Sequence, residues 1–90
     1  EPVLQKITGR DNAQPALGVF RQKKIPLSKA ASGLWIALEQ PRDPGNLGTI
    51  IRTTDAVKAD GVMLIGPACD PFSPETIRAT MGSFARIPVV

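Results

Sequence analysis

Residues 34–52 read LWIALEQPRDPGNLGTIIR, and this stretch decides the fold class of the chain. It begins with five consecutive apolar residues, 34–38, and such a run is typical of a parallel strand covered on both faces. Turn residues follow, and the spacing of apolar residues then predicts an amphipathic helix over residues 46–58. The apolar side of that helix consists of Leu47, Ile50, Ile51, Thr54 and Val57. A strand that leads directly into a helix indicates an α/β protein.

The remainder of the chain continues this alternation. Residues 61–65, GVMLI, predict a second buried strand, and residues 87–90 predict a third. Between them, the letters SPE at residues 73–75 supply the N-cap serine, early proline and first-turn acid that begin a helix, predicted over residues 76–81. The sequence therefore predicts a parallel sheet with Rossmann-like βαβαβ order and right-handed connections.

The composition describes one small globular domain and excludes several kinds of site. The chain has 90 residues, of which 42% are apolar and 21% charged, and no apolar run approaches the length of a membrane span. With one cysteine and no histidine, we expect no disulfide framework, no metal site and no catalytic triad that uses histidine. The sequence favours a cytoplasmic protein. Trp35 is expected in the core, and the scattered phenylalanines predict no stacking platform for bases.

The first third of the chain carries the positive charge. Residues 1–30 have a balance of +4 and residues 31–90 a balance of −1, which together give the net charge of +3. A short strand is predicted over residues 16–21 and a connector over residues 26–33. At the end of that strand and just after it lies a basic cluster that consists of Arg21, Lys23 and Lys24. Such a cluster favours contact with a nucleic acid, but it is also compatible with an ordinary solvated loop.

The junction between the first strand and the first helix has the chemistry of a tight turn. The letters DPGN at residues 43–46 are strong turn formers, and Asn46 is predicted to cap the helix, with Asp43 complementing its dipole. Ligands of open α/β sheets usually bind at such a junction, beside the backbone donors of a helix start. We therefore expect an anionic partner at this end of the sheet.

One face of the predicted helix carries two glycines and two opposite charges. Gly45, Gly48, Arg52 and Asp55 recur at spacings of three or four and so share that face. The glycines leave an uncrowded edge that a phosphate would approach, Arg52 would bind a phosphate or ribose oxygen, and Asp55 would hold its guanidinium in place. The same pattern is compatible with glycines that pack against a strand and an exposed Arg52–Asp55 pair.

These residues resemble a known family. Residues 38–65, which contain the letters DPGNLGTIIR, look like the first motif of the SpoU-type RNA ribose 2′-O-methyltransferases, within the SPOUT superfamily. Residues 79–90, ATMGSFARIPVV, resemble the stretch that follows it in that family. Residues 15–25 are similar to the link from an N-terminal substrate-binding domain into the catalytic domain.

The resemblance implies an activity and a set of site residues. The activity is transfer of a methyl group from S-adenosylmethionine to a ribose 2′-hydroxyl of tRNA or rRNA, with Asn46 and Arg52 as the catalytic residues. Because an arginine stays protonated, we expect Arg52 to stabilise the developing alkoxide rather than to act as a base, and Asn46 to orient the ribose or the guanidinium. The residues predicted to contact RNA are Gly45, Gly48, Arg21, Lys23, Lys24 and Arg86.

The resemblance also implies a division of the chain. Residues 1–30 are expected to be a basic linker or the end of an N-terminal RNA substrate-binding domain, and residues 31–90 the N-terminal half of a SPOUT catalytic domain. We expect this sequence to be a fragment that ends before the C-terminal knot, to be inactive alone and to lack assignable cofactor-binding residues, with the full-length protein a homodimer. Two other functions stay open: a non-catalytic RNA- or phosphate-binding α/β module, and a plain α/β scaffold.

Overall fold

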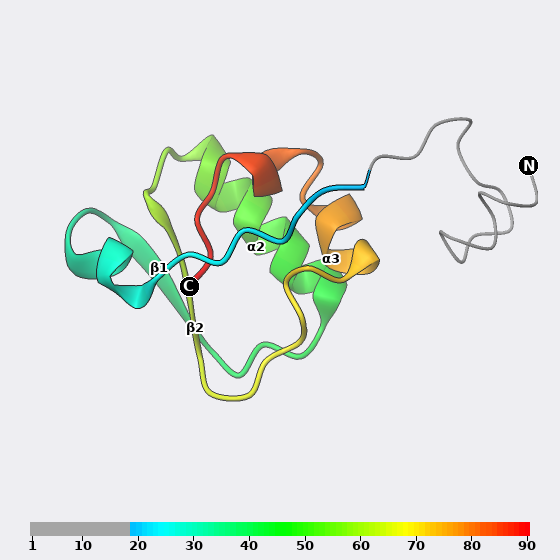
Figure 1. Ribbon diagram of the computed structural model, residues 1–90, viewed down its shortest axis with the longest axis horizontal. Coiled ribbons are helices and arrows are strands. Elements are labelled where there is room, and N and C mark those ends of the chain that lie inside the picture. The colour runs from blue at the N-terminus through cyan, green and yellow to red at the C-terminus, as the bar shows by residue number, and fades with distance from the viewer. Residues whose placement is uncertain (1–18) are drawn as a thin grey trace, which may run out of the picture.

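The computed structural model describes residues 19–90, so the first part of the predicted strand over residues 16–21 lies outside the described residues. Residues 19–26 carry no regular secondary structure, so no strand forms in the described part of that prediction. The predicted connector contains a 3₁₀ helix, η1 (Leu27–Ala31). Figure 1 shows the segment before η1 running across the front of the α/β unit.

The sheet has the predicted parallel order. Strands β1 (Trp35–Glu39) and β2 (Gly61–Ile65) pair in parallel, with Trp35 opposite Gly61 and Glu39 opposite Ile65. The third predicted strand is present as an isolated parallel bridge between Val62 and Val89, supported by a 2.7 Å hydrogen bond from the Leu64 amide to the Val90 carbonyl. This segment binds the side of β2 away from β1, so β2 is central (Figure 1).

The first long helix, α2 (Pro44–Ala56), begins and ends two residues earlier than predicted. Its N-cap is Asp43, whose carboxylate accepts hydrogen bonds from two first-turn amides, so the prediction that Asn46 caps the helix is wrong. The second predicted helix is present as α3 (Pro74–Ala79), which begins and ends two residues earlier than predicted, and the predicted cap Ser73 is confirmed. A 3₁₀ helix, η2 (Ser83–Ala85), then leads into the C-terminal segment.

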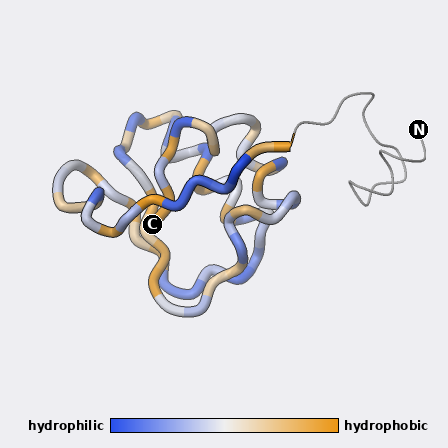
Figure 2. The backbone as a smooth tube through the Cα atoms, viewed as in Figure 1, coloured by the Kyte–Doolittle hydropathy of each residue, from blue (hydrophilic) through white to orange (hydrophobic). Residues whose placement is uncertain are grey.

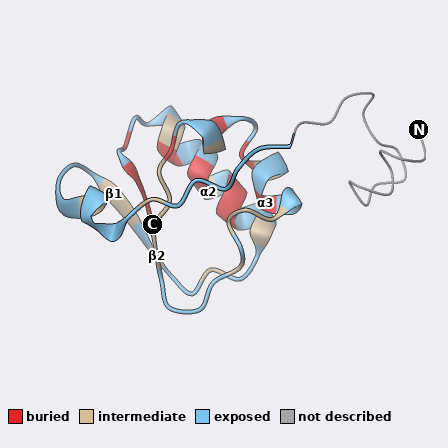
Figure 3. Ribbon diagram, in the orientation of Figure 1, coloured by how far each residue is buried: buried red, intermediate tan, exposed pale blue. Residues whose placement is uncertain are grey.

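The core lies between α2 and one face of the sheet. Leu47 and Ile51 of α2 are fully buried against Val62 and Ile87, and Figure 3 shows the buried residues concentrated on α2 and the start of β2. Figure 1 shows α2 crossing the middle of the unit, with the strands on one side and α3 on the other. Val57 is 63% exposed because α2 ends before it, so the predicted apolar side stops at Thr54.

The opposite face of the sheet is not covered by residues 19–90. Ala37 and Ile65 are exposed there, so the prediction that β1 is covered on both faces is wrong for the described part of the chain. Trp35 also differs from its prediction: it lies half-buried on this open face, its indole N–H donates to the Ser32 carbonyl at 2.8 Å, and its ring covers Gly61.

Candidate functional site

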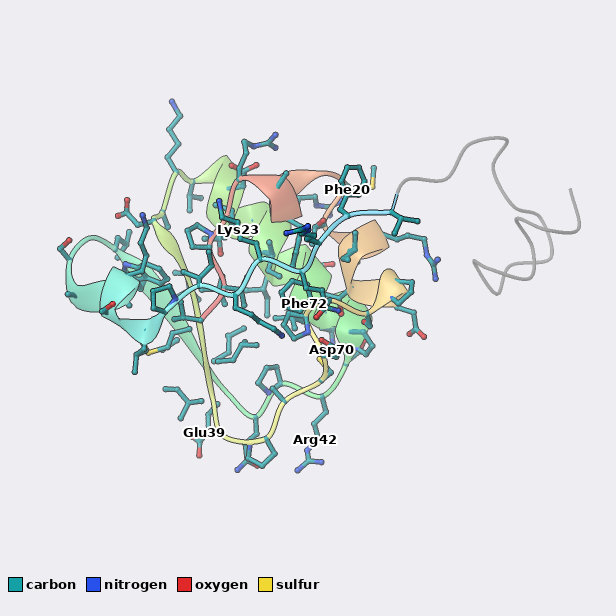
Figure 4. The ribbon with its side chains drawn as sticks, viewed as in Figure 1. Phe20, Lys23, Glu39, Arg42, Asp70 and Phe72 are labelled. Carbon is teal, nitrogen blue, oxygen red and sulfur yellow. The ribbon has the colours of Figure 1, made fainter. Side chains whose placement is uncertain are left out.

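The loops that follow β1 and β2 meet at the carboxyl edge of the sheet. The Gln40 amide donates to the Ile65 carbonyl and the Cys69 amide to the Pro41 carbonyl, each at 2.8 Å. These bonds hold the two loops side by side around an open hollow of about 220 Å³, lined by Arg42, Pro67, Ala68 and Cys69. Figure 4 shows Arg42 directed away from the ribbon at this edge. Arg42 carries no signal of its own in the sequence, because it sits among turn residues without a periodic partner.

The backbone donors at the start of α2 are already occupied. The Asp43 carboxylate accepts hydrogen bonds from the Gly45 amide at 2.8 Å and the Asn46 amide at 3.2 Å. A carboxylate in this position both satisfies the free amides and places a negative charge beside the helix N-terminus. The prediction that these backbone donors meet an anionic partner is therefore wrong, and an anion would be bound by side chains instead.

Replacement of Asp43 by alanine is expected to destabilise the protein by about 1 kcal/mol, because two amides of α2 lose their acceptor. Replacement by asparagine keeps an acceptor oxygen and is expected to cost much less. Urea unfolding of the two variants in the intact protein measures the difference. Equal stability of the alanine and asparagine variants would show that the cap contributes little.

The two glycines of the predicted face have different environments. Gly45 is exposed, and a Cβ there would meet only the Asp43 carboxylate at 3.3 Å. Gly48 is buried, and a Cβ there would lie 2.4 Å from the Ala79 Cβ and 2.6 Å from the Thr76 carbonyl oxygen. The prediction that Gly48 forms an uncrowded edge for RNA is therefore wrong, because this glycine allows α2 and α3 to pack closely.

Both predicted catalytic side chains lie on exposed positions of α2. Asn46 is in the first turn, and Arg52 lies six residues later, about 9 Å further along the helix axis. Within residues 19–90, the Arg52 side chain makes no hydrogen bond and no ion pair. The guanidinium and the carboxamide are therefore both accessible to a polyanionic ligand.

The carboxylate that was expected to hold Arg52 binds another arginine. Asp55 Oδ2 accepts hydrogen bonds from Arg86 Nε at 2.9 Å, Arg86 Nη2 at 2.5 Å and Ser83 Oγ at 2.8 Å. The predicted pair between Asp55 and Arg52 is therefore wrong. We call Asp55, Ser83 and Arg86 the Asp55 cluster, and it joins the last turn of α2 to η2 and the segment that follows.

The Arg86 side chain is largely exposed to solvent and is also bound to Asp55. Its side chain is 63% exposed although it pairs with Asp55, whose side chain is 22% exposed. The prediction that Arg86 contacts RNA stays a prediction, but the structure gives this arginine a partner inside the chain.

The Asp55 cluster makes the stability depend on pH in the acid range. Hydrogen bonds from Arg86 and Ser83 lower the pKa of Asp55 below its ordinary value, and Asp55 raises the pKa of Arg86. A lowered carboxyl pKa contributes stability above the unfolded value of about 3.9, and this contribution is lost as the pH falls through the folded pKa. We expect the Tm of Asp55→Asn to fall less than that of the wild type between about pH 6 and pH 2.5. Glu39→Gln, which removes an exposed carboxylate, is the control; an equal fall for wild type and Asp55→Asn would contradict the assignment.

The basic segment lies against the aromatic residues. Lys24 Nζ is 4.5 Å from the centre of the Phe72 ring, and Phe72 in turn meets Phe84 edge-to-face with centroids 5.4 Å apart. The sequence did not predict this aromatic contact, because the two phenylalanines are far apart along the chain. Figure 2 shows the hydrophilic character of the segment, and Figure 4 places Lys23 on it, where Arg21 and Lys23 are exposed. Contact of Arg21, Lys23 and Lys24 with RNA stays a prediction.

The described part of the chain offers neither a group of metal ligands nor a membrane-spanning helix. Among residues 19–90, no three side chains of the metal-ligating types come together. No helix in that range combines the length and hydropathy needed to cross a membrane.

Comparison with known proteins decides the family. The model of the SpoU rRNA methylase family matches residues 33–90, which include both strands, α2, α3 and the C-terminal segment. The chain belongs to the SpoU rRNA methylase family. This confirms the resemblance drawn from the letters DPGNLGTIIR.

The similarity to members of this SpoU family extends over the whole chain. A curated relative, the 23S rRNA (guanosine(2553)-2'-O)-methyltransferase RlmP of Bacillus subtilis, is 38% identical over 90 residues. A solved rRNA methyltransferase from Sinorhizobium meliloti is 50% identical, with a TM-score of 0.92. The SpoU methyltransferase AviRb from Streptomyces viridochromogenes is 38% identical over 63% of the chain, with a TM-score of 0.62. The chain spans 36% of the length of the Bacillus and Sinorhizobium proteins and 22% of AviRb.

Proposed function

We propose that the protein containing this chain transfers a methyl group from S-adenosylmethionine to a ribose 2′-hydroxyl of ribosomal RNA. The observation that carries the proposal is the 38% identity, across all 90 residues, to a relative named as a 2'-O-methyltransferase of 23S rRNA. The exposed and unpaired state of Arg52 among the described residues agrees with a role toward RNA.

The side chains of α2 would act on the acceptor ribose. Arg52 keeps its proton at any physiological pH, so it would stabilise the alkoxide that forms on the 2′-oxygen and bind the adjacent phosphate. The proton would pass to a phosphate oxygen or to water. Asn46, about 9 Å away along the helix, would orient a different oxygen of the sugar–phosphate backbone. Gly45 is exposed and adds no side-chain bulk to this part of α2, where the Asp43 carboxylate is the nearest group.

The cofactor proposal is supported by the relatives rather than by a pocket in residues 19–90. Solved structures of the rRNA methyltransferase from Sinorhizobium meliloti and of AviRb contain AdoMet. The hollow beside Arg42 has about 220 Å³, whereas pockets for ligands of this size have about 300–1,000 Å³. The described residues therefore do not enclose the cofactor by themselves, and none of them is assigned to its binding. The division of the chain at residue 30, the homodimer and the cytoplasmic location also stay predictions.

The reaction is tested by mass spectrometry of the product. Intact protein, ribosomal RNA and isotopically labelled S-adenosylmethionine are incubated, and the RNA is digested to nucleosides. We expect the label in a 2′-O-methyl nucleoside, and no label at that position in an otherwise identical RNA with a 2′-deoxyribose there. A labelled base, or no transfer to any ribosomal RNA, would contradict the proposal. Salt-dependent RNA binding without transfer would indicate the non-catalytic module instead.

A further inference from the structure

The Asp55 cluster lies next to the proposed catalytic arginine. Asp55 follows Arg52 by three residues on α2, and side chains with this spacing are neighbours on a helix surface. The two opposite charges do not pair within residues 19–90; instead Asp55 Oδ2 accepts hydrogen bonds from two Arg86 nitrogens and from the Ser83 hydroxyl, and Arg86 neutralises the carboxylate charge. In the described part of the chain, Arg52 is a neighbour of Asp55 by helical spacing and Arg86 by contact, and only Arg86 binds the carboxylate.

The pairing of Asp55 with Arg86 affects how Arg52 can bind RNA. A carboxylate without Arg86 would attract the neighbouring guanidinium of Arg52, and a phosphate would then have to compete with it. The same carboxylate would also repel the phosphate, since its charge would no longer be neutralised. The positive charge of Arg86 opposes both effects, and Arg86 binds Asp55 through two of its own nitrogens, a geometry that lysine cannot reproduce.

We propose that Arg86 is a positioning residue that occupies Asp55 and so leaves the guanidinium of Arg52 free to bind the RNA backbone. The proposal rests on the proposed function in one respect, namely that Arg52 contacts RNA. It assigns a role to Arg86 that needs no contact between Arg86 and RNA. It also explains why Arg52 remains unpaired beside an acidic residue, as far as residues 19–90 show.

The experiment compares RNA affinity in single and double variants of the intact protein. Arg86→Ala is expected to weaken binding of ribosomal RNA about two- to fivefold at low ionic strength, since Asp55 then competes for Arg52. The double variant Arg86→Ala/Asp55→Asn lacks the competing carboxylate and is expected to recover the wild-type affinity. Lys58→Ala removes one exposed positive charge just beyond α2 and is the matched control for charge alone.

The outcomes separate the proposal from its alternatives. An affinity that stays low in the double variant would overturn it, because Arg86 would then contact RNA or act only on stability. An unchanged affinity in Arg86→Ala would overturn it as well. If the alanine variants fail to fold, Arg86→Gln, which keeps an amide donor for Asp55 but not the charge, is tested alone and with Asp55→Asn. Failure of the role proposed for Arg52 is recognised separately, by wild-type RNA affinity and methyl transfer in Arg52→Ala, and failure of the proposed function by the absence of 2′-O-methyl transfer in the wild type.

Discussion

Arg52→Ala in the intact protein is expected to lower kcat for methyl transfer by about 10²–10³-fold, the usual loss when one preorganised donor to a developing oxyanion is removed. The side chain is exposed and makes no hydrogen bond or ion pair within the described range, so its loss should leave the Tm nearly unchanged. The effect is therefore expected in catalysis and not in stability. Single-turnover transfer to ribosomal RNA measures it.

Two further variants test the assignment of Arg52. Arg52→Lys keeps the charge but loses the planar fork of donors, so we expect a rate between those of the wild type and the alanine variant. Lys58→Ala removes a cation close to the same helix and is expected to change the rate less than twofold at moderate salt. A wild-type rate in Arg52→Ala would remove this residue from the reaction.

Gly48→Ala is expected to give the largest loss of stability among the single substitutions considered. The new Cβ would lie 2.4 Å from the Ala79 Cβ and 2.6 Å from the Thr76 carbonyl oxygen, both fixed to the backbone of α3. The strain of such overpacking, about 1–3 kcal/mol or more, exceeds the gain in helix propensity of about 1 kcal/mol. We expect a net loss of up to about 2 kcal/mol, and the Tm of the intact protein to fall by several degrees.

Gly45→Ala is the matched control, because it changes the same residue type in the same helix. Its Cβ would meet only the Asp43 carboxylate, at 3.3 Å, and that side chain can move slightly. The stability should therefore stay within about 0.5 kcal/mol of the wild type. If Gly48→Ala were as stable as Gly45→Ala, the close packing of α2 on α3 would not exist in solution.

Local signals in the sequence were sufficient for most of the fold. The run GVMLI predicts β2 with its observed bounds, and the serine–proline–acid signal predicts the start of α3. The family resemblance was also readable, because a motif of turn residues and one arginine has a fixed spacing. The start of α2 was less certain, since Asp43 and Asn46 are both good caps and only the backbone geometry decides between them.

The site was harder to predict because its contacts join distant parts of the chain. Gly45 and Gly48 look alike in the sequence, and only the position of Ala79 makes one of them a packing residue. Likewise, Asp55 has a near arginine three residues away and binds one that is 31 residues away. A helical pattern describes neighbours along one helix, and it contains no information on which other segment lies beside them.

The order of pairing in the sheet constrains how the chain can acquire its structure during synthesis. Trp35 pairs with Gly61, and Val62 pairs with Val89, so the strand contacts within residues 19–90 join residues more than twenty positions apart. The ribosome must therefore release β2 before the ladder between β1 and β2 can form, and must release residues 88–90 before β2 gains its second neighbour. Such non-local pairings form slowly, so the backbone groups of β1 stay unpaired until β2 has been synthesised. A chaperone that shields β1 during this time should therefore raise the yield of folded protein.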